Sequence, residues 1–242
     1  MTTLLLVHAF PVDAGMWDEQ VTALEGDLRV LAPSLPGFGG QATAGEVMTM
    51  DAAADFLAEE LDRAEVDRAV VCGLSIGGYI AFSMWRRHSQ RISGLVLANT
   101  KAEPDDEAGR ERRRQVAEKA RSEGSGAIAE APPPLLSEGA DPALWERVRE
   151  MIRRQPGEAI AAASLGMADR PDSRPILPQI DVPTTIVVGS ADSLIPPEVS
   201  EAMATDIRGS EVVVLEGAGH LSNLEEPQGF TTALRGIVDR AG

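Results

Sequence analysis

The clearest chemical pattern lies at 70–82, where a β-branched run ends in two glycines that bracket a serine, Gly73-Leu74-Ser75-Ile76-Gly77. A helical apolar pattern resumes directly after it. A sharp turn between a strand and a helix strains the backbone of its central residue and requires small neighbours. The serine Oγ then projects from the edge of the sheet. A serine that only caps a helix needs no glycine two residues earlier, so the pattern favours a nucleophile.

A serine hydroxyl needs a base to remove its proton, and the base needs an acid to orient it. The chain has three histidines. His88 ends the helical pattern after Ser75 and is expected on the surface. His8 directly follows the first apolar run and is expected to shape a loop. His220 lies in a glycine-flanked loop between the last apolar run and the final helical pattern, so we interpret it as the base.

The best candidate for the orienting acid is Asp192, which follows an apolar run in the segment TTIVVGSADSLIPP. Taken alone, this aspartate is better interpreted as a turn former. The preceding apolar run ends in Asn99 and Thr100, which offer no carboxylate. Combined with the serine and the histidine, the pattern predicts the catalytic triad Ser75, Asp192 and His220.

Hydrolysis through a serine also needs hydrogen-bond donors for the oxyanion of the tetrahedral intermediate. The loop after the first apolar run, His8-Ala9-Phe10-Pro11, lies where one such donor is expected. We assign the oxyanion hole to the backbone N–H groups of Phe10 and Ile76. The alternative is a turn set by Pro11 with no catalytic part.

These distant segments need a common scaffold, and short apolar runs that alternate with helical patterns provide one. Six runs predict strands: 3–7, 28–31, 69–72, 95–98, 184–188 and 212–215. They are nearly unbroken, as expected where helices cover both faces of a parallel sheet. Helical patterns occupy 17–24, 50–64, 76–87 and 227–240. The alternation predicts an α/β fold with a mostly parallel central sheet flanked by helices.

Residues 101–180 interrupt this alternation with charged helical stretches, a proline-rich joint and an alanine-rich segment. We interpret them as a helical cap on a core formed by 1–100 and 181–242. The charged runs are expected to be solvated outer faces. Seven apolar residues are candidates for substrate binding: Leu135, Leu136, Trp145, Leu165, Met167, Ile195 and Leu221. Since none is charged, the pocket is expected to be apolar.

Composition narrows the possible partners. The 242 residues carry a formal net charge of −16, which argues against nucleic-acid and anionic-membrane partners. The single cysteine, Cys72, excludes an internal disulfide framework and fits a reducing compartment. The segment MTTLLLVHAF has no basic region, and its apolar run is too short for a signal peptide or a membrane span. We expect a cytoplasmic protein, and no metal, because no metal-ligand spacing of His, Cys or acidic residues appears.

The segments CGLSIGG, ANTKAEPD, SLGMADRPDS, ADSLIPP and GAGHLSNLEEP resemble the α/β-hydrolase superfamily, and within it small bacterial carboxylesterases and 3-oxoadipate enol-lactonases. The resemblance covers nearly the whole chain, and the triad has the chain order typical of the superfamily. It implies an α/β-hydrolase fold, serine-ester hydrolysis, no cofactor and a cap at about 101–180. Ala9 departs from the usual glycine of the oxyanion loop, and Ser34 and Gln41 stand where relatives usually have Asp and Ser.

Relatives usually begin with an antiparallel β-hairpin, which we expect to be missing here. Its absence leaves the strand at 28–31 on the edge of the sheet. An exposed edge invites pairing with another chain. The strand is therefore either short and blunted by Pro33, which we favour, or it meets a second subunit. A monomer or a homodimer is expected.

The sequence thus predicts a serine carboxylesterase that hydrolyses neutral short-chain esters through an acyl-enzyme on Ser75. A lactonase similar to the enol-lactonases is the main alternative. Its dicarboxylate substrate would need a cation such as Arg153, Arg154 or Arg170. Two further alternatives use the same scaffold. One is a perhydrolase side activity, and the other is a ligand-binding protein without turnover. A dehalogenase or an epoxide hydrolase would need an aspartate at position 75.

Overall fold

Six strands form one sheet in the computed structural model, which describes residues 2–43 and 45–242. The strands are β1 (Thr3–Val7), β2 (Arg29–Leu31), β3 (Ala69–Leu74), β4 (Ile92–Ala98), β5 (Thr184–Gly189) and β6 (Glu211–Leu215). Their order is β2-β1-β3-β4-β5-β6, and every neighbouring pair is parallel. The predicted α/β class with a parallel central sheet is therefore confirmed.

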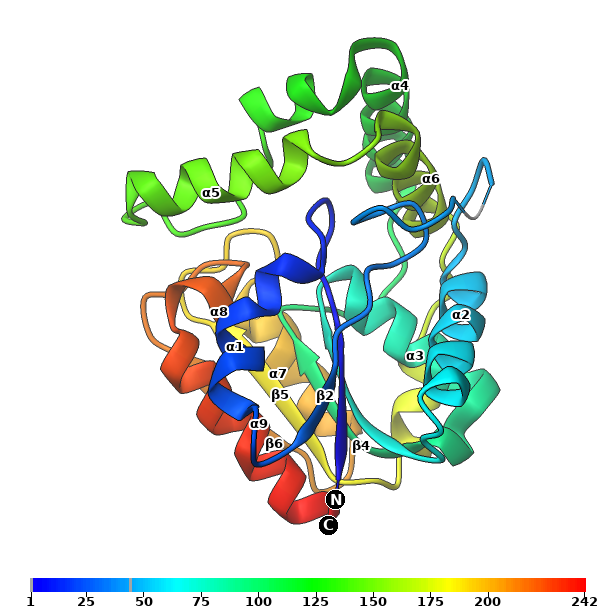
Figure 1. Ribbon diagram of the computed structural model, residues 1–242, viewed down its shortest axis with the longest axis vertical. Coiled ribbons are helices and arrows are strands. Elements are labelled where there is room, and N and C mark those ends of the chain that lie inside the picture. Colours follow the sequence, from blue (N-terminus) through cyan, green and yellow to red (C-terminus); the bar gives the residue numbers. More distant parts are fainter. Residues whose placement is uncertain (1, 44) are drawn as a thin grey trace.

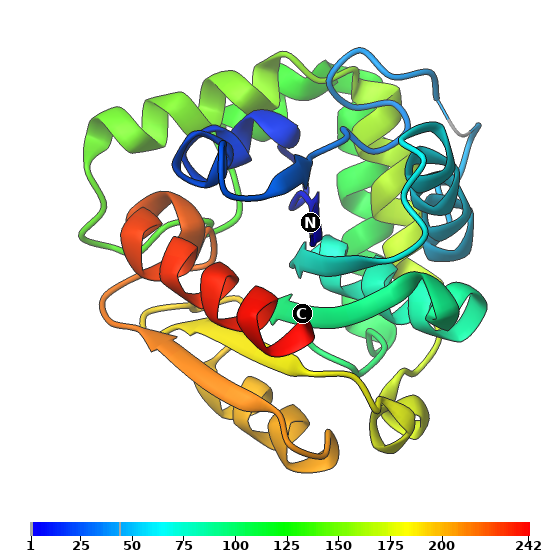
Figure 2. The ribbon, with the colours of Figure 1, turned by 60° about the horizontal axis from the view of Figure 1, so that its bottom comes forward.

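Helices cover both faces of this sheet, which explains why its central strands are apolar on both sides. Helices α1 (Asp18–Leu24) and α9 (Pro227–Ala241) lie on one face, and α2 (Met50–Arg63) and α3 (Ile76–His88) lie on the other (Figures 1 and 2). Helix α7 (Pro197–Asp206) packs against β5, and the short α8 (Ser222–Glu225) precedes α9. The side chains of β1, β3 and β5 are all buried.

The register of the sheet brings the ends of its central strands level. Val7 at the end of β1 pairs with Gly73, and Ala98 at the end of β4 pairs with both Leu74 and Val187. The loops that follow β1, β3, β4 and β5 therefore leave the sheet at one edge. In open α/β sheets this carboxyl edge is where ligands bind.

The strand predicted at 28–31 lies at the edge of the sheet that the described residues form, as expected. Strand β2 is three residues long, and Pro33 follows it closely. Strand β1 has the predicted bounds, and the other predicted elements recur with shifted ends. Strand β4 begins at Ile92 and not at 95, because Gly94 interrupts an apolar run that the sheet continues through. Helix α7 had no counterpart in the prediction.

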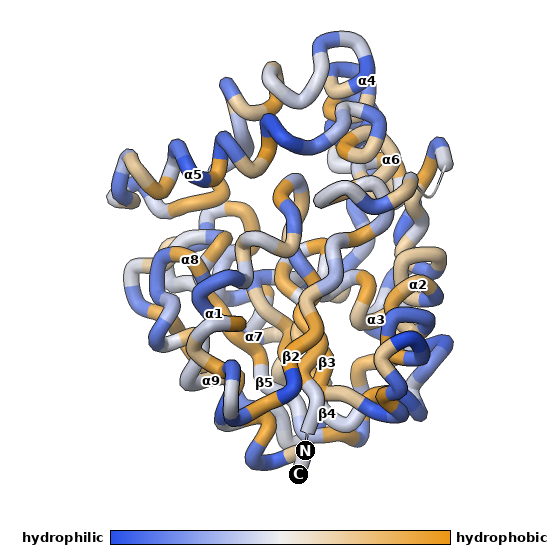
Figure 3. The backbone as a smooth tube through the Cα atoms, viewed as in Figure 1, coloured by the Kyte–Doolittle hydropathy of each residue, from blue (hydrophilic) through white to orange (hydrophobic). Residues whose placement is uncertain are grey.

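Three helices follow β4 and lie across the carboxyl edge of the sheet: α4 (Glu107–Glu130), α5 (Pro142–Arg153) and α6 (Gly157–Ala168) (Figure 1). Helix α4 kinks at Gly124, which has a φ of 80°, and packs against α6. Hydrophilic residues alternate with hydrophobic ones along α4 and α5, whereas β3 is largely hydrophobic (Figure 3). We keep the name cap for residues 101–180, whose division from the core remains a prediction.

None of the helices in residues 2–43 and 45–242 combines the length and the apolar character needed to cross a membrane.

Candidate active site

Ser75 lies at the join of β3 and α3 with a backbone that few serines adopt, with φ 58° and ψ −114°. A positive φ at a non-glycine residue costs free energy and persists only where its surroundings impose it. Two hydrogen bonds impose it here. The Ser75 N–H donates to the Ala98 carbonyl at 2.9 Å, and the Thr100 hydroxyl donates to the Ser75 carbonyl at 2.8 Å. The turn is therefore built from two adjacent strand ends.

The two glycines that bracket Ser75 are required by close backbone approaches. A Cβ on Gly73 would lie 2.2 Å from the carbonyl oxygen of Gly77. A Cβ on Gly77 would lie 2.3 Å from the carbonyl oxygen of Val7 in β1. Both contacts are with backbone atoms, which cannot swing aside as a flexible side chain can. The spacing seen in the sequence thus follows from the geometry of the turn.

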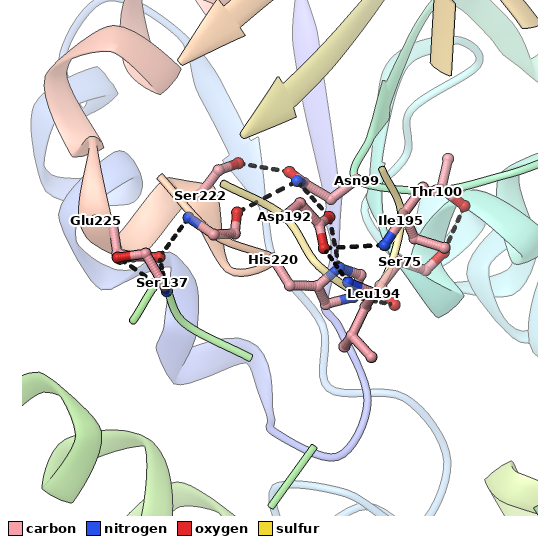
Figure 4. Close-up of polar contacts among 11 residues, drawn as sticks. Ser75, Asn99, Thr100, Ser137, Asp192, Leu194, Ile195, His220, Ser222 and Glu225 are labelled. Carbon is pink, nitrogen blue, oxygen red and sulfur yellow. Dashed lines mark hydrogen bonds and ion pairs between the residues drawn. The ribbon is translucent and has the colours of Figure 1, made fainter. Parts of the chain in front are cut away.

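A continuous chain of hydrogen bonds joins the three predicted triad residues (Figure 4). His220 Nε2 lies 2.8 Å from Ser75 Oγ, and His220 Nδ1 lies 2.8 Å from Asp192 Oδ2. An ionised carboxylate only accepts hydrogen bonds, so Nδ1 carries the proton and Nε2 accepts from the serine hydroxyl. All three residues are buried. This is the tautomer in which the imidazole can remove the serine proton.

Asp192 is fixed by four donors. Its Oδ1 accepts from the backbone N–H groups of Leu194 (2.8 Å) and Ile195 (3.0 Å), and its Oδ2 also accepts from Asn99 Nδ2 (2.9 Å). Burial opposes ionisation of this carboxyl, but the hydrogen bond and charge of His220 and the donors from Ile195 and Asn99 outweigh it. The pKa of Asp192 is therefore lowered. The carboxylate is ionised at neutral pH and can stabilise an imidazolium.

Asn99 is a residue of the site that the sequence reasoning noted only for lacking a carboxylate. It adopts a φ of 45° at the end of β4, accepts from the Ser222 hydroxyl at 2.6 Å and donates to Asp192 (Figure 4). Its place at a strand end beside the acid loop was the available signal. Asn99 therefore helps to orient the Asp192 carboxylate, which in turn orients His220.

Glu225 in α8 was also missed. Its carboxylate accepts from the Gly219 N–H at 2.7 Å and from the Ser137 N–H and hydroxyl (Figure 4). The Leu221 N–H donates to the carbonyl of Leu135 at 2.8 Å. The loop that carries His220 is therefore tied to a segment of the cap. The position of Glu225 after His220 in the sequence does not by itself indicate a contact with Ser137.

The two assigned oxyanion donors lie at the same edge. Phe10 follows β1 and lines the cavity beside Ser75, and the Ile76 N–H is in the first turn of α3. Within the described part of the chain, neither N–H donates to a protein acceptor. A free N–H at a helix N-terminus is suited to a developing negative charge. Their catalytic role remains a prediction.

His8 shapes the loop that carries Phe10. Its Nδ1–H donates to the Ala9 carbonyl, and its Nε2 accepts from the Leu35 N–H, both at 2.9 Å. Both ring nitrogens are thus used by the neutral form. Burial lowers the pKa of His8 to about 4, although the Ala9 hydrogen bond and the Asp13 charge act in the opposite direction. The other histidine outside the triad, His88, pairs with Asp55 on the surface as expected.

This buried histidine predicts a loss of stability in mild acid. In the unfolded chain, His8 is protonated as the pH falls below about 6.5. In the folded chain, it is protonated only near pH 4, because its pKa is lowered. The free energy of unfolding should therefore fall by about 2 kcal/mol between pH 7 and pH 5 from this group. Urea denaturation of the wild type and of His8→Gln measures it. Ser122→Ala, on the exposed side of α4, removes no titratable group and should keep the wild-type slope. A wild-type slope in His8→Gln would contradict the assignment.

A cavity of about 470 Å³ opens onto Ser75 and His220. Three of the seven predicted pocket residues line it, together with Phe10 of the oxyanion loop: Leu135, Met167 and Ile195. The other four candidates, Leu136, Trp145, Leu165 and Leu221, pack into the core and are not among its lining residues. Tyr79, Val116, Ile128 and Leu194 contribute apolar surface that was not anticipated.

The cavity has the expected apolar wall, but it is not apolar throughout. Lys101, Arg112, Arg113 and Lys119 line the cavity together with Asp105. The sequence reasoning assigned the charged runs of the cap to solvated faces, but one face of α4 turns toward the cavity. The arginines that were considered for a substrate carboxylate lie elsewhere, since Arg153 and Arg154 are on the surface and Arg170 is buried against Tyr79 and Asp105.

In the described residues, no group of three or more His, Cys, Asp or Glu side chains is arranged to hold a metal ion.

The sequence matches the family described as alpha/beta hydrolase fold over residues 2–227. The chain therefore belongs to the α/β-hydrolase family, and it is a hydrolase with esterase relatives. Among solved structures, it is similar to a thermophilic esterase from Thermogutta terrifontis with malate bound, at 42% identity and a TM-score of 0.96 over 100% of this chain and 90% of that one.

Two curated relatives act on different substrates. The chain is 28% identical to 3-oxoadipate enol-lactonase 1 of Acinetobacter baylyi, over 97% of this chain and 88% of the relative. It is 27% identical to the pimeloyl-[acyl-carrier protein] methyl ester esterase of Neisseria meningitidis, over 97% of this chain and 92% of the relative. The resemblance to esterases and enol-lactonases inferred from sequence motifs is confirmed.

Proposed function

We propose that the protein is a serine carboxylesterase that hydrolyses small carboxylic esters through an acyl-enzyme on Ser75. The observation that carries this proposal is the pair of 2.8 Å contacts from His220, one to Ser75 Oγ and one to Asp192. The contacts open onto a cavity large enough for a small molecule. Relatives named as esterases support the same reaction.

In the proposed first step, Ser75 Oγ attacks the ester carbonyl while His220 Nε2 takes the hydroxyl proton. Asp192 holds the proton on Nδ1 and stabilises the imidazolium that forms. The N–H groups of Phe10 and Ile76 donate to the oxyanion. Each such donor is typically worth about 3 kcal/mol of transition-state stabilisation.

In the second half of the reaction, the imidazolium returns its proton to the leaving alcohol, and the C–O bond to the alcohol breaks. Water then attacks the acyl-enzyme while His220 takes one of its protons. Collapse of the second tetrahedral intermediate releases the carboxylic acid and restores the Ser75 hydroxyl. These reaction steps require neither a redox reaction nor a metal ion.

The size of the cavity favours short substrates. Each buried methylene of a fitting acyl chain contributes about 0.8 kcal/mol, but 470 Å³ must hold both the acyl part and the alcohol part. The apolar wall formed by Val116, Ile128, Leu135 and Met167 suits a few methylenes. We therefore expect acetate to butyrate esters to be favoured over long-chain lipids.

A lactonase is the second candidate. The cations that line the cavity are groups that would meet the free carboxylate of an enol-lactone acid, and one relative is named a 3-oxoadipate enol-lactonase. The same triad opens a lactone by the same two steps. The two candidates differ in the substrate that fits, not in the residues that react.

A panel of p-nitrophenyl esters from acetate to laurate, measured beside 3-oxoadipate enol-lactone, tests the choice. We expect kcat/KM to peak at butyrate or below and to fall by at least about tenfold by octanoate, as the cavity fills. A kcat/KM for the lactone that exceeds the best ester by several orders of magnitude would favour the lactonase. No turnover of any ester or lactone would favour a ligand-binding protein.

A further inference from the structure

The cavity wall on α4 is positively charged although the chain as a whole carries a net charge of −16. Arg112, Val116 and Lys119 are spaced by four and three residues, so they share one face of the helix. All three line the cavity, as does Arg113. Lys101, from the segment after β4, adds a fourth cation.

The single carboxylate in this lining does not balance the cations. Asp105 is buried and lies 2.8 Å from Arg170, 3.1 Å from Arg113 and 3.6 Å from Lys101. Arg170 itself is held behind the wall, with its guanidinium 4.2 Å from the centre of the Tyr79 ring. The Asp105 carboxylate is therefore already paired with three cations.

Arg112 and Lys119 are the two cations that remain. Neither forms an ion pair with any residue in the ranges 2–43 and 45–242, whereas their neighbours on the outer face do. Arg114 pairs with Glu107 and Glu111, and Arg121 pairs with Glu158. Two cations without a carboxylate partner on the wall of this cavity, Lys119 partly buried and Arg112 exposed to solvent, are placed to bind an anion in an otherwise acidic protein.

The reacting atoms and these cations line the same cavity. Ser75 and His220 lie in it together with the apolar residues Val116, Leu135 and Met167. A ligand that fills the cavity therefore contacts the nucleophile, a short apolar stretch and the positive wall. A guanidinium and an ammonium both donate strong hydrogen bonds to a carboxylate.

We propose that the preferred substrates are small esters that carry a second, free carboxylate, which Arg112 and Lys119 bind. This inference rests on the proposed esterase function and specifies its substrate class. The carboxylate belongs either to the acyl part, as in a half-ester of a short dicarboxylic acid, or to the alcohol part, as in an acylated hydroxy acid. In both, water replaces the alcohol on the acyl carbon and the second carboxylate takes no part in bond breaking.

The test compares charged and neutral esters of similar size. Monoethyl glutarate places the carboxylate on the acyl part, and 3-carboxyphenyl butyrate places it on the alcohol part. Ethyl valerate and 3-carbamoylphenyl butyrate are their neutral partners. We expect the wild type to favour one charged ester over its neutral partner by at least about tenfold in kcat/KM at low salt. The favoured arm identifies the side that carries the carboxylate.

The double variant Arg112→Gln/Lys119→Gln should lower that ratio at least about tenfold, with the effect mainly on KM. Raising the salt concentration should lower the wild-type ratio toward that of the variant. Arg114→Gln removes a charge from the outer face of the same helix and should keep the wild-type ratio. Circular dichroism and a thermal unfolding curve check that the variants fold.

A ratio near one for both pairs in the wild type would overturn the proposal, and so would an equal ratio in the wild type and a folded double variant. These outcomes differ from failure of the esterase proposal itself. In that case, neither charged nor neutral esters turn over and Ser75 does not react with an acylating probe. Glutarate offers an independent check, because it should inhibit the wild type competitively and the double variant at least about tenfold less strongly.

Discussion

Replacing Ser75 with alanine is expected to lower kcat/KM for ester hydrolysis by about 10⁴-fold or more. The substitution removes the Oγ that lies 2.8 Å from His220 Nε2 and leaves no atom to form the acyl-enzyme. His220→Ala should lose about as much. Asp192→Asn should lose somewhat less, because the three residues act as a unit and the base itself remains. Initial rates with p-nitrophenyl butyrate measure each loss.

The loss must come from chemistry and not from unfolding. Ser75→Ala keeps the small side chain that the turn accepts, so its thermal unfolding midpoint should stay close to that of the wild type. Ser122→Ala is a matched control, since Ser122 lies on the exposed side of α4 and donates only to the Glu118 carbonyl. Folded Ser75→Ala protein that hydrolyses the ester at the wild-type rate would contradict the assignment.

Gly73→Ala should both destabilise the fold and inactivate the site. The added Cβ would lie 2.2 Å from the Gly77 carbonyl oxygen, so the turn that holds Ser75 must open. Overpacking of this kind typically costs 1 to 3 kcal/mol, here about 3 kcal/mol because the contact is with backbone. A shift of the serine by about 1 Å would cost roughly 100-fold in kcat. Urea denaturation and initial rates measure the two effects.

Gly236→Ala is the control for this substitution. Gly236 lies in α9, where an added Cβ would have no neighbour within 4 Å. Alanine is the better helix former by about 1 kcal/mol, so this variant should be as stable as the wild type or more so, with unchanged activity. If Gly73→Ala were as stable and as active as Gly236→Ala, the turn would not need its glycine.

The meeting of Ser75, Asp192 and His220 could be predicted because each of them follows its own strand within a few residues. The serine turn needs two glycines, and the aspartate and histidine loops carry prolines and glycines that mark them as loops. Strand β3 ends at Leu74 and β5 ends at Gly189, so the residues that follow them meet at one edge. The order of these strands in the sequence and their parallel direction were sufficient to predict that the three residues meet.

The contacts that support the triad could not be predicted in the same way. Asn99 reaches Asp192 across 93 positions of the chain, and Glu225 reaches Ser137 across 88. Such contacts depend on how separate loops pack, which no local pattern contains. A polar residue in a loop carries the same local signal whether it faces solvent or a neighbouring loop.

The charged lining of the cavity was missed for a different reason. The buried residues of α4 are mostly small, such as Ala117 and Ala120, so the helix lacks the apolar stripe that would show which face is covered. Helical spacing placed Arg112 and Lys119 on one face but did not indicate what that face meets. The position of α4 over the sheet turns this face toward Ser75.

Labelling with a fluorophosphonate tests the central claim most directly. The probe phosphonylates a serine only when a base has activated its hydroxyl. Peptide mass spectrometry of the folded wild type should find one adduct, on the peptide that contains Ser75. Ser75→Ala should carry none, and His220→Ala should react far more slowly. No adduct on the folded wild-type protein, or an adduct on a serine other than Ser75, would contradict the account.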